Sequence, residues 1–292
     1  MPKQEKNKTI EKILVALDLS EMDDIIIDYA KFISDFWEIK QIGFIHNIKK
    51  SDLYGLWNGF LEEEKIPLEK MINKEISEKI DNVFDATVSY TVEVTADDYT
   101  ESVIKRKVKE NQIDLLLLGK KHDLKGTGSL AHKLMNLLDC DVLFVPEQVN
   151  HQLKDVLLPT DFTQNSAKAF KKALYFDSKQ NWNMEALHVY SIPSVYFPYI
   201  DREKAIDKTQ ETVLAKFKNF ENRFKLGDFS FHQIYRENLS VVESILEEAT
   251  QKKADMIMLS AKGGNKITTL FVGSTTSDLL LNESDLPVYV VK

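Results

Sequence analysis

Residues 13–20 have the sequence ILVALDLS, and residues 156–163 have the sequence VLLPTDFT. Each stretch is a short apolar run that ends in an aspartate, and a residue that can begin a helix follows soon after. Four more pairs of segments recur in the same order along the chain: His46 with His188, 113–119 with 254–260, Gly128-Ser129 with Gly273-Ser274, and 142–145 with 288–291. Similarity that extends over so much of the sequence predicts two homologous domains.

The repeat divides the chain into a first domain, residues 1–148, and a second domain, residues 149–292. In both domains short apolar runs alternate with helical patterns. Continuous apolar runs such as 115–118 are typical of strands buried on both faces of a parallel sheet. In the second domain we expect strands at 155–160, 184–190, 229–235, 256–260 and 288–291. The alternation predicts the α/β class, with two repeated three-layer α/β/α domains and right-handed crossovers.

Serine residues precede two of the helical patterns. We expect Ser20 to cap the helix that follows the first strand, and Ser240 to cap a helix over residues 239–250. The long connections at 53–84 and 193–226 are charged, and their helical spacing predicts the outermost helix of each domain.

The composition excludes several classes of protein. Of the 292 residues, 46 are Asp or Glu and 38 are Lys or Arg, and the net charge of −8 argues against nucleic acid or an anionic membrane as a partner. Cys140 is the single cysteine, so no internal disulfide and no cysteine-based zinc site can form. The polar residues 1–8, and the lack of a run of about 18 apolar residues, predict a cytoplasmic protein without a secretory signal or a membrane span.

A phosphate-binding pattern follows the fourth expected strand of the second domain. The sequence contains neither a P-loop nor the dinucleotide fingerprint after a first strand. Instead, Ser260 is followed after two residues by Gly263 and, nine residues later, by Gly273. Gly263 can adopt a positive φ that lets the backbone approach a phosphate, and Gly273 lies where the free N–H groups of the next helix begin. Asp161 ends the first strand, where it can reach a ribose hydroxyl or a phosphate-bound Mg²⁺.

With its repeat and this motif, the chain resembles a tandem universal stress protein. Nucleotide-binding members of that family carry G-x2-G-x9-G-[ST] after their fourth strand, and this sequence matches from Gly263 to Ser274, with Ser260 in place of the first glycine. Residues 159–163 (PTDFT) also resemble the family's first-strand signature. The resemblance implies the adenine-nucleotide alpha hydrolase-like fold, with a five-stranded parallel sheet of order 3-2-1-4-5 in each domain.

The resemblance also implies a site in the second domain for ATP, or for ADP or AMP, together with Mg²⁺. Adenine would pack near Val189 and Leu259. The ribose would contact Pro159 and Asp161, and Asp161 would also reach the nucleotide-bound Mg²⁺. The phosphates would rest on a run of small residues: Ser260, Gly263, Gly273, Ser274 and Thr275. The serine at 260 either narrows the approach of the phosphate or supplies an extra hydroxyl.

The first domain departs from this pattern. Eight residues separate Gly119 from Gly128, where twelve separate the matching pair in the second domain, so four residues of the phosphate loop are missing. His122 stands where the loop glycine would align, Ala16 replaces the first-strand proline, and Asn47 replaces the valine of the adenine contact. We expect this domain to bind no ATP, although its helix start can still hold a small anion.

Other candidate groups have plainer interpretations. We interpret Lys120, Lys121 and Lys125 as a solvated loop. The histidines show no metal-ligand spacing, and His46 and His188 are expected to form structural hydrogen bonds within strands. The sequence offers no catalytic constellation, so hydrolysis of ATP would depend on Mg²⁺ and positioning alone and would be slow at most.

The leading hypothesis is a stress-response or signalling protein that uses ATP as a regulatory ligand and acts on an unidentified protein partner. Two other functions stay open. One is an interaction scaffold that binds no nucleotide because Ser260 closes the site. The other is an enzyme of the wider adenine-binding α/β group, which would need a nucleophile or base that the sequence does not provide.

The expected fifth strands, 142–145 and 288–291, are apolar and lie at a sheet edge in the implied strand order. An exposed apolar edge strand is an aggregation hazard, and single-domain members of the family cover theirs by pairing two copies. We therefore expect the two fifth strands of this chain to pair with each other as a pseudo-dimer, with Phe144 opposite Tyr289. A further homodimer of whole chains is compatible with the sequence.

Overall fold

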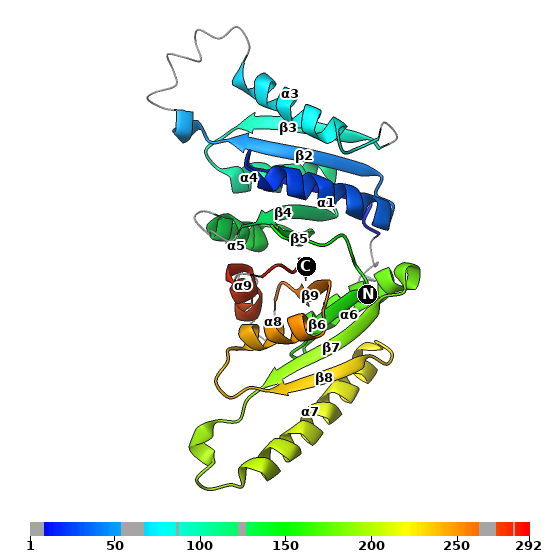
Figure 1. Cartoon of the computed structure of the whole chain (residues 1–292), viewed down its shortest axis with the longest axis vertical. Coiled ribbons are helices and arrows are strands. Elements are labelled where there is room, and N and C mark those ends of the chain that lie inside the picture. The colour runs from blue at the N-terminus through cyan, green and yellow to red at the C-terminus, as the bar shows by residue number, and fades with distance from the viewer. Residues whose placement is uncertain (1–8, 54–66, 86–87, 122–126, 263–272, 283) are drawn as a thin grey trace, which may run out of the picture. The chain divides into compact units, whose positions relative to one another are not determined.

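The computed structural model describes residues 9–53, 67–85, 88–121, 127–262, 273–282 and 284–292 (Figure 1). The described residues form two compact units, Lys8–His151 and Gln152–Lys292, which are the first and the second domain of the text below. Each unit carries five strands that alternate with helices.

The elements of the first domain follow one another in this order: β1 (Lys12–Leu17), α1 (Met22–Trp37), β2 (Gln41–Ile48), the 3₁₀ turn η1 (Lys50–Leu53), α3 (Leu68–Asp81), β3 (Tyr90–Ala96), α4 (Thr100–Asn111), β4 (Leu115–Lys120), α5 (Thr127–Leu137) and β5 (Asp141–Pro146). The second domain repeats the order: β6 (Asp155–Pro159), α6 (Gln164–Gln180), β7 (Asn183–Tyr190), the 3₁₀ turn η2 (Ser194–Tyr196), α7 (Arg202–Phe224), β8 (Ser230–Tyr235), α8 (Val241–Gln251), β9 (Met256–Ser260), α9 (Ser274–Leu281) and β10 (Val288–Val291).

The strands of each domain form a parallel sheet in the order that the family resemblance implied. The first domain has the order β3-β2-β1-β4-β5 and the second has β8-β7-β6-β9-β10, which is 3-2-1-4-5 in both. Connections between parallel strands are right-handed, and their direction reverses after the third strand of each domain. The helices before and after the reversal therefore cover opposite faces of the sheet, and α4 contacts α5 on one of them. The three-layer α/β prediction is confirmed.

The central strands are buried on both faces. Leu115, Leu116 and Leu117 of β4 have no exposed surface, and every residue of β5 and of β9 is buried. Parallel strands covered by helices on both sides need such continuous apolar runs. The pattern that predicted the strands is therefore the pattern that fills the core.

An aspartate fixes the start of the first strand in each domain. Asp114, just before β4, accepts hydrogen bonds at Oδ2 from the backbone N–H groups of residues 11–12, at 3.0 and 3.1 Å. Asp255, just before β9, makes the same two bonds to residues 154–155, both at 2.9 Å. Each carboxylate thus ties the first strand to the fourth across about a hundred residues of intervening chain.

A histidine makes an equivalent link between the first and second strands of each domain. Nδ1 of His46 donates to the carbonyl oxygen of Leu17 at 3.0 Å, and Nδ1 of His188 donates to that of Thr160 at 2.7 Å. The structural role expected for both histidines is confirmed.

Both serines predicted as helix caps accept hydrogen bonds from N–H groups at the start of their helix. Ser240 caps α8 in a capping box, in which its hydroxyl accepts from the N–H of Glu243 and the Glu243 carboxylate accepts from the N–H of Ser240. Ser20 stands just before α1, whose assigned cap position, Glu21, has helical dihedral angles and makes no side-chain cap. The Ser20 hydroxyl accepts from the N–H of Met22 at 3.3 Å, and its carbonyl oxygen accepts from the N–H of Asp23 at 3.0 Å. The same hydroxyl donates to Asp18 Oδ1 at 2.5 Å.

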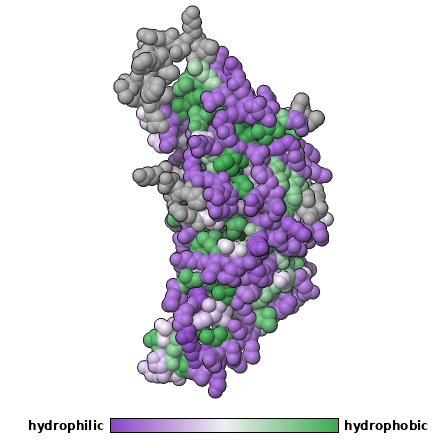
Figure 2. Space-filling model, in the orientation of Figure 1, coloured by the Kyte–Doolittle hydropathy of each residue, from purple (hydrophilic) through white to green (hydrophobic). Residues whose placement is uncertain are grey.

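The charged outer helices predicted from the two long connections are α3 and α7. Helix α7 buries Val213, Phe217 and Phe220 along one face and leaves most of its charged residues exposed. On the face seen in Figure 2, hydrophilic residues predominate and apolar residues form separate groups. No helix within the described ranges is long and apolar enough to cross a membrane.

Replacing Asp255 tests whether its carboxylate ties the first strand of the second domain to the fourth. Asp255→Ala should lower the free energy of unfolding by about 2–3 kcal/mol, because two backbone N–H groups lose a charged acceptor. Urea unfolding followed by circular dichroism measures the change. Asp228→Ala removes a carboxylate whose side chain is fully exposed and serves as the control, with an unchanged midpoint expected. Equal unfolding midpoints for the two variants would contradict this stabilising role of Asp255.

Candidate functional site

The carboxyl edge of the second sheet brings together the apolar residues predicted to contact adenine and ribose. β6 pairs with β7 at Pro159↔Leu187 and with β9 on its other side. This parallel register places Leu259 beside Pro159, and Val189 lies two residues beyond Leu187. Leu259 is buried, whereas Pro159 and Val189 are half-buried at the end of their strands. The three side chains therefore belong to one edge of the sheet.

The start of α9 is tied to the end of β9. Thr276 is buried, and its hydroxyl donates to the carbonyl oxygen of Ser260 at 3.0 Å. The N–H of Gly273 donates to the carbonyl oxygen of Ala261 at 2.9 Å, and Gly273 occupies the cap position of α9 without any side-chain cap. Ser274 and Thr275 form the first turn of the helix. The first turn of α9 thus stands at the carboxyl edge of the sheet.

The side chain of Ser260 forms a hydrogen bond within the loop that follows it. Its hydroxyl donates to the carbonyl oxygen of Lys262 at 2.7 Å, and the residue is 9% exposed. The hydroxyl therefore shapes the backbone at the start of the phosphate loop. Gly263, the next predicted phosphate contact, lies outside the described residues.

Asp161 orders the loop after β6. It is exposed, and its Oδ1 accepts from the N–H of Thr163 at 3.1 Å and from the hydroxyl of Thr163 at 2.6 Å. Thr163 in turn caps α6 by accepting from the N–H of Ser166. The carboxylate predicted to meet ribose or Mg²⁺ is thereby held at the sheet edge by the cap of the next helix.

Phe162 closes the inner side of the same loop. Its φ of 62° is left-handed, and its ring lies 4.3 Å from the ring of His188. Burial lowers the pKa of His188 below its ordinary value, which favours the neutral imidazole. The loop between Pro159 and Thr163 is therefore anchored by an aromatic contact on one side and by Asp161 on the other.

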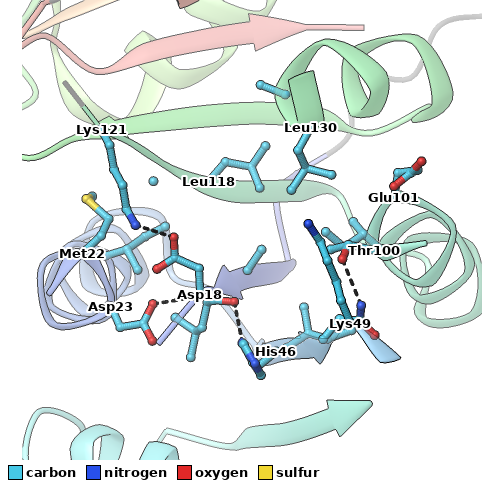
Figure 3. Close-up of a pocket in the computed structure, with 18 of the residues that line it drawn as sticks. Asp18, Met22, Asp23, His46, Lys49, Thr100, Glu101, Leu118, Lys121 and Leu130 are labelled. Atoms are coloured by element: carbon cyan, nitrogen blue, oxygen red, sulfur yellow. Dashed lines mark hydrogen bonds and ion pairs between the residues drawn. The ribbon is translucent and has the colours of Figure 1, made fainter. Parts of the chain in front are cut away.

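The first domain contains a cavity of about 490 Å³ at the matching edge of its sheet (Figure 3). Its walls come from the ends of β1, β2 and β4 and from α1, α4 and α5. Figure 3 shows Asp18 and Lys121 on one side of the cavity and Thr100 and Glu101 on the other. The space lies where the second domain carries its predicted nucleotide residues.

An ion pair closes one side of this cavity. Lys121 Nζ lies 2.6 Å from Asp18 Oδ2, and Lys120 is 5% exposed at the end of β4. The interpretation of these lysines as part of a solvated loop is therefore wrong for Lys120, whereas Lys121 follows the strand and is half-buried, and Lys125 lies outside the described residues. Burial by itself would raise the pKa of Asp18, but hydrogen bonds from Lys121 and Ser20 outweigh it and hold that pKa below its ordinary value.

Asp23, in α1, holds the loop that follows β1 and contains Asp18. It is 2% exposed, and its two oxygens accept from the N–H groups of Asp18 and Leu19, both at 2.9 Å. Burial raises the pKa of Asp23. At the equivalent place in the second domain stands Ser166, whose hydroxyl lies 3.0 Å from that of Thr160.

Two more residues, Met22 and Asn47, make the carboxyl edge of the first-domain sheet different from that of the second domain. Met22 packs against Gly119 so closely that a Cβ at position 119 would lie 2.5 Å from Met22 Cγ. Asn47, at the place of the adenine-contacting valine, uses its amide nitrogen to bond Asp97 O and Thr100 Oγ1. Its amide oxygen accepts from the hydroxyl of Thr95. The polar groups of Asn47 are therefore engaged within the domain.

Sequence reasoning missed Met22, Asp23 and the Asp18–Lys121 pair. The repeat holds a signal for Asp23, because an acidic residue there aligns with Ser166 in the second copy. Nothing in the spacing of the chain indicates that Lys121 folds back onto Asp18. Within the described residues, no group of three or more His, Cys, Asp or Glu side chains is arranged to hold a metal ion.

Parallel sheets of order 3-2-1-4-5 define a pair of adenine-nucleotide alpha hydrolase-like domains, and in the second of them the helix start is tied to the end of the fourth strand. The model of the universal stress protein family matches the sequence twice, over residues 9–146 and 152–292. The chain therefore belongs to the universal stress protein family. No curated protein matches the sequence.

Solved structures share this architecture. A universal stress protein from Archaeoglobus fulgidus DSM 4304 is 18% identical, with a TM-score of 0.67 over 98% of this chain and 99% of that one. A Pseudomonas aeruginosa UCBPP-PA14 protein described as a universal stress protein is 12% identical, with a TM-score of 0.67 over 98% of this chain and 94% of that one. At these identities the likeness establishes the fold.

Removing the ion-pair partner should change the titration of Asp18. In the Lys121→Met variant the pKa of Asp18 should rise, because burial then acts without the cation. In the native protein the lowered pKa contributes stability above the unfolded value of about 3.9, and this contribution is lost as the pH falls through the folded pKa. Carboxyl-carbon NMR titration measures the pKa. Lys31→Met, which removes the partner of Asp35, is the control, and an unshifted Asp18 in the Lys121 variant would refute the assignment.

A serine at position 119, which matches Ser260 of the second domain, should destabilise the first domain. Gly119→Ser should destabilise the protein by about 1–3 kcal/mol through overpacking against Met22. Thermal unfolding measures the loss. Met22→Ala combined with Gly119→Ser should cost less than the sum of the single changes. Simple additivity would mean that the two positions do not touch.

Proposed function

We propose that this universal stress protein binds an adenine nucleotide, ATP or a related ADP or AMP, with Mg²⁺ in its second domain. The observation that carries the proposal is the link between Thr276 and Ser260, which holds the first turn of α9 at the carboxyl edge of the sheet. Ligands of open parallel sheets bind at this edge, where the strand order reverses. The unpaired N–H groups and the dipole of a helix start favour a phosphate.

The residues at the edge suit the parts of the nucleotide. Pro159, Val189 and Leu259 offer apolar surface for adenine and for the carbon face of the ribose. Asp161 offers an exposed carboxylate for a ribose hydroxyl or for Mg²⁺. Phosphates would be held by residues of the loop and of the helix start: Ser260, Gly263, Gly273, Ser274 and Thr275. Mg²⁺ would neutralise phosphate charge when bound.

The contrast with the first domain supports binding at a single site. There Met22 covers Gly119, Lys121 engages Asp18, and the polar groups of Asn47 are used within the domain. The phosphate loop is also four residues shorter than in the second domain. One nucleotide per chain is the stoichiometry that follows.

We further propose that the nucleotide is a regulatory ligand, in a cytoplasmic stress-response or signalling role that involves a protein partner. Among the residues that the structure describes, the edge of the second sheet offers binding groups and no arrangement of nucleophile and base. Any hydrolysis would depend on Mg²⁺ and positioning and would be slow. The pairing of the two fifth strands expected from the sequence stays a prediction.

Isothermal titration of the full chain with ATP and Mg²⁺ should give about one site per molecule. Ser274→Asp should weaken ATP binding by at least about tenfold, which is about 1.4 kcal/mol, because the new carboxylate faces the phosphates. The same change favours the helix dipole, so it should not unfold α9. Ser129→Asp, at the matching helix start of the first domain, is the control and should leave ATP binding unchanged. Two equal sites, or equal losses in the two variants, would overturn the proposal.

One observation favours a second function, a scaffold that binds no nucleotide. Ser260 replaces a glycine, and its hydroxyl is tied to the backbone of Lys262 at the entrance of the phosphate loop. In that case ATP with Mg²⁺ would not raise the melting temperature, whereas a ligand of the native state must do so. A thermal-shift series in ATP concentration distinguishes the two functions.

A further inference from the structure

The first-domain cavity has the size and walls of a small-molecule site. Ligand pockets have volumes of roughly 300–1,000 Å³ and mostly apolar walls, and this one has about 490 Å³. The lining includes aliphatic side chains from the sheet and from three helices: Ile26, Ile45, Ile104, Leu118, Leu130 and Ala131. The interior thus favours an apolar ligand body.

Two of the lysines around the cavity are already neutralised. Lys121 lies 2.6 Å from Asp18, and Lys133 lies 2.9 Å from Glu101. The third carboxylate of the lining, Asp23, is 2% exposed, and both its oxygens accept backbone N–H groups. The acidic groups that face the cavity are therefore each engaged within the domain.

Lys49 is the remaining cation of the lining. It is exposed at the end of β2, and among the described residues no carboxylate lies within 4.0 Å of its Nζ. It acts on Glu101 only through the longer-range attraction that helps to lower the pKa of that residue. Figure 3 shows its side chain extending along the cavity between His46 and Thr100. Among the described residues, the accessible part of the lining therefore carries one lysine more than it carries carboxylates, while the third carboxylate, Asp23, is buried.

The same edge is poorly suited to a nucleotide. Asn47 has no amide group left to read a base, because its nitrogen and oxygen bond Asp97, Thr95 and Thr100. Met22 fills the space beside Gly119. A triphosphate would also bring several negative charges to a rim whose described residues include a single lysine without a carboxylate within 4.0 Å.

We propose that the first-domain cavity binds a small ligand with an apolar body and one anionic group, of the class of medium-chain carboxylates. The alkyl chain lies against the aliphatic walls, and Lys49 Nζ pairs with the carboxylate at the rim. One charge meets one charge there, and the chain is removed from water at about 25 cal/mol per Å² of buried apolar surface. The site is separate from the proposed nucleotide site, in residues and in ligand chemistry.

Sodium octanoate and the full-length protein test the proposal. Octanoate should bind with one site per chain and raise the melting temperature in a concentration-dependent way. Octanol, which has the same chain without the charge, should bind at least about tenfold more weakly. No octanoate binding at millimolar concentration, or equal binding of octanol, would overturn the proposal.

Matched lysine variants locate the binding. Lys49→Met keeps the apolar stem and removes the charge, and it should weaken octanoate binding by about tenfold or more. Lys50→Met changes the next residue, which does not line the cavity, and should leave the affinity within about twofold. Ser274→Asp, in the second domain, should also leave it unchanged. Equal effects of Lys49→Met and Lys50→Met, or competition of octanoate with ATP, would refute the assignment.

Discussion

The parallel pairing of the first strand with the second and the fourth is the constraint on which each domain depends. Asp114 and Asp255 hold this pairing at the strand starts, where each carboxylate accepts two backbone N–H groups of the first strand. His46 and His188 hold it at the strand ends, through the carbonyl group that precedes the functional loop. Because both ends of the first strand are fixed, the loop that follows it lies at the carboxyl edge of the sheet in both domains. Ligands of open parallel sheets bind at this edge.

The same loop is built twice and used differently. Leu19 and Phe162 share a φ of 62°, and in both copies the preceding aspartate accepts a hydrogen bond from the N–H of the residue two positions on. In the first domain Lys121 forms an ion pair with that aspartate, whereas in the second domain the aspartate accepts from the hydroxyl of Thr163, the residue that caps α6. The duplicated scaffold therefore keeps its backbone device while the groups around it diverge, and this divergence is why we assign the two domains different ligands.

The sequence predicted the strands of the second domain to within one residue, as well as the strand order and the Ser240 cap. The strands and the cap follow from local patterns and from the repeat, whereas the strand order follows from the resemblance to the universal stress protein family. The sequence did not predict the Lys121–Asp18 pair, because it depends on a side chain that crosses from β4 to the end of β1. The packing of Met22 on Gly119 was equally hidden, since it needs the position of α1 over the sheet. The sequence thus predicted that the site lies at the carboxyl edge of the sheet, but it could not predict the long-range side-chain contacts there.

The central claim is that two domains of one fold differ in their ability to bind a nucleotide. Amide NMR spectra of the full chain, recorded with and without ATP and Mg²⁺, test it most directly because they report each domain separately. The account predicts that the signals of Asp161, Ser274 and Thr275 shift while those of Asp18 and Leu118 stay in place. Shifts of equal size in both domains, or shifts confined to the first, would contradict it.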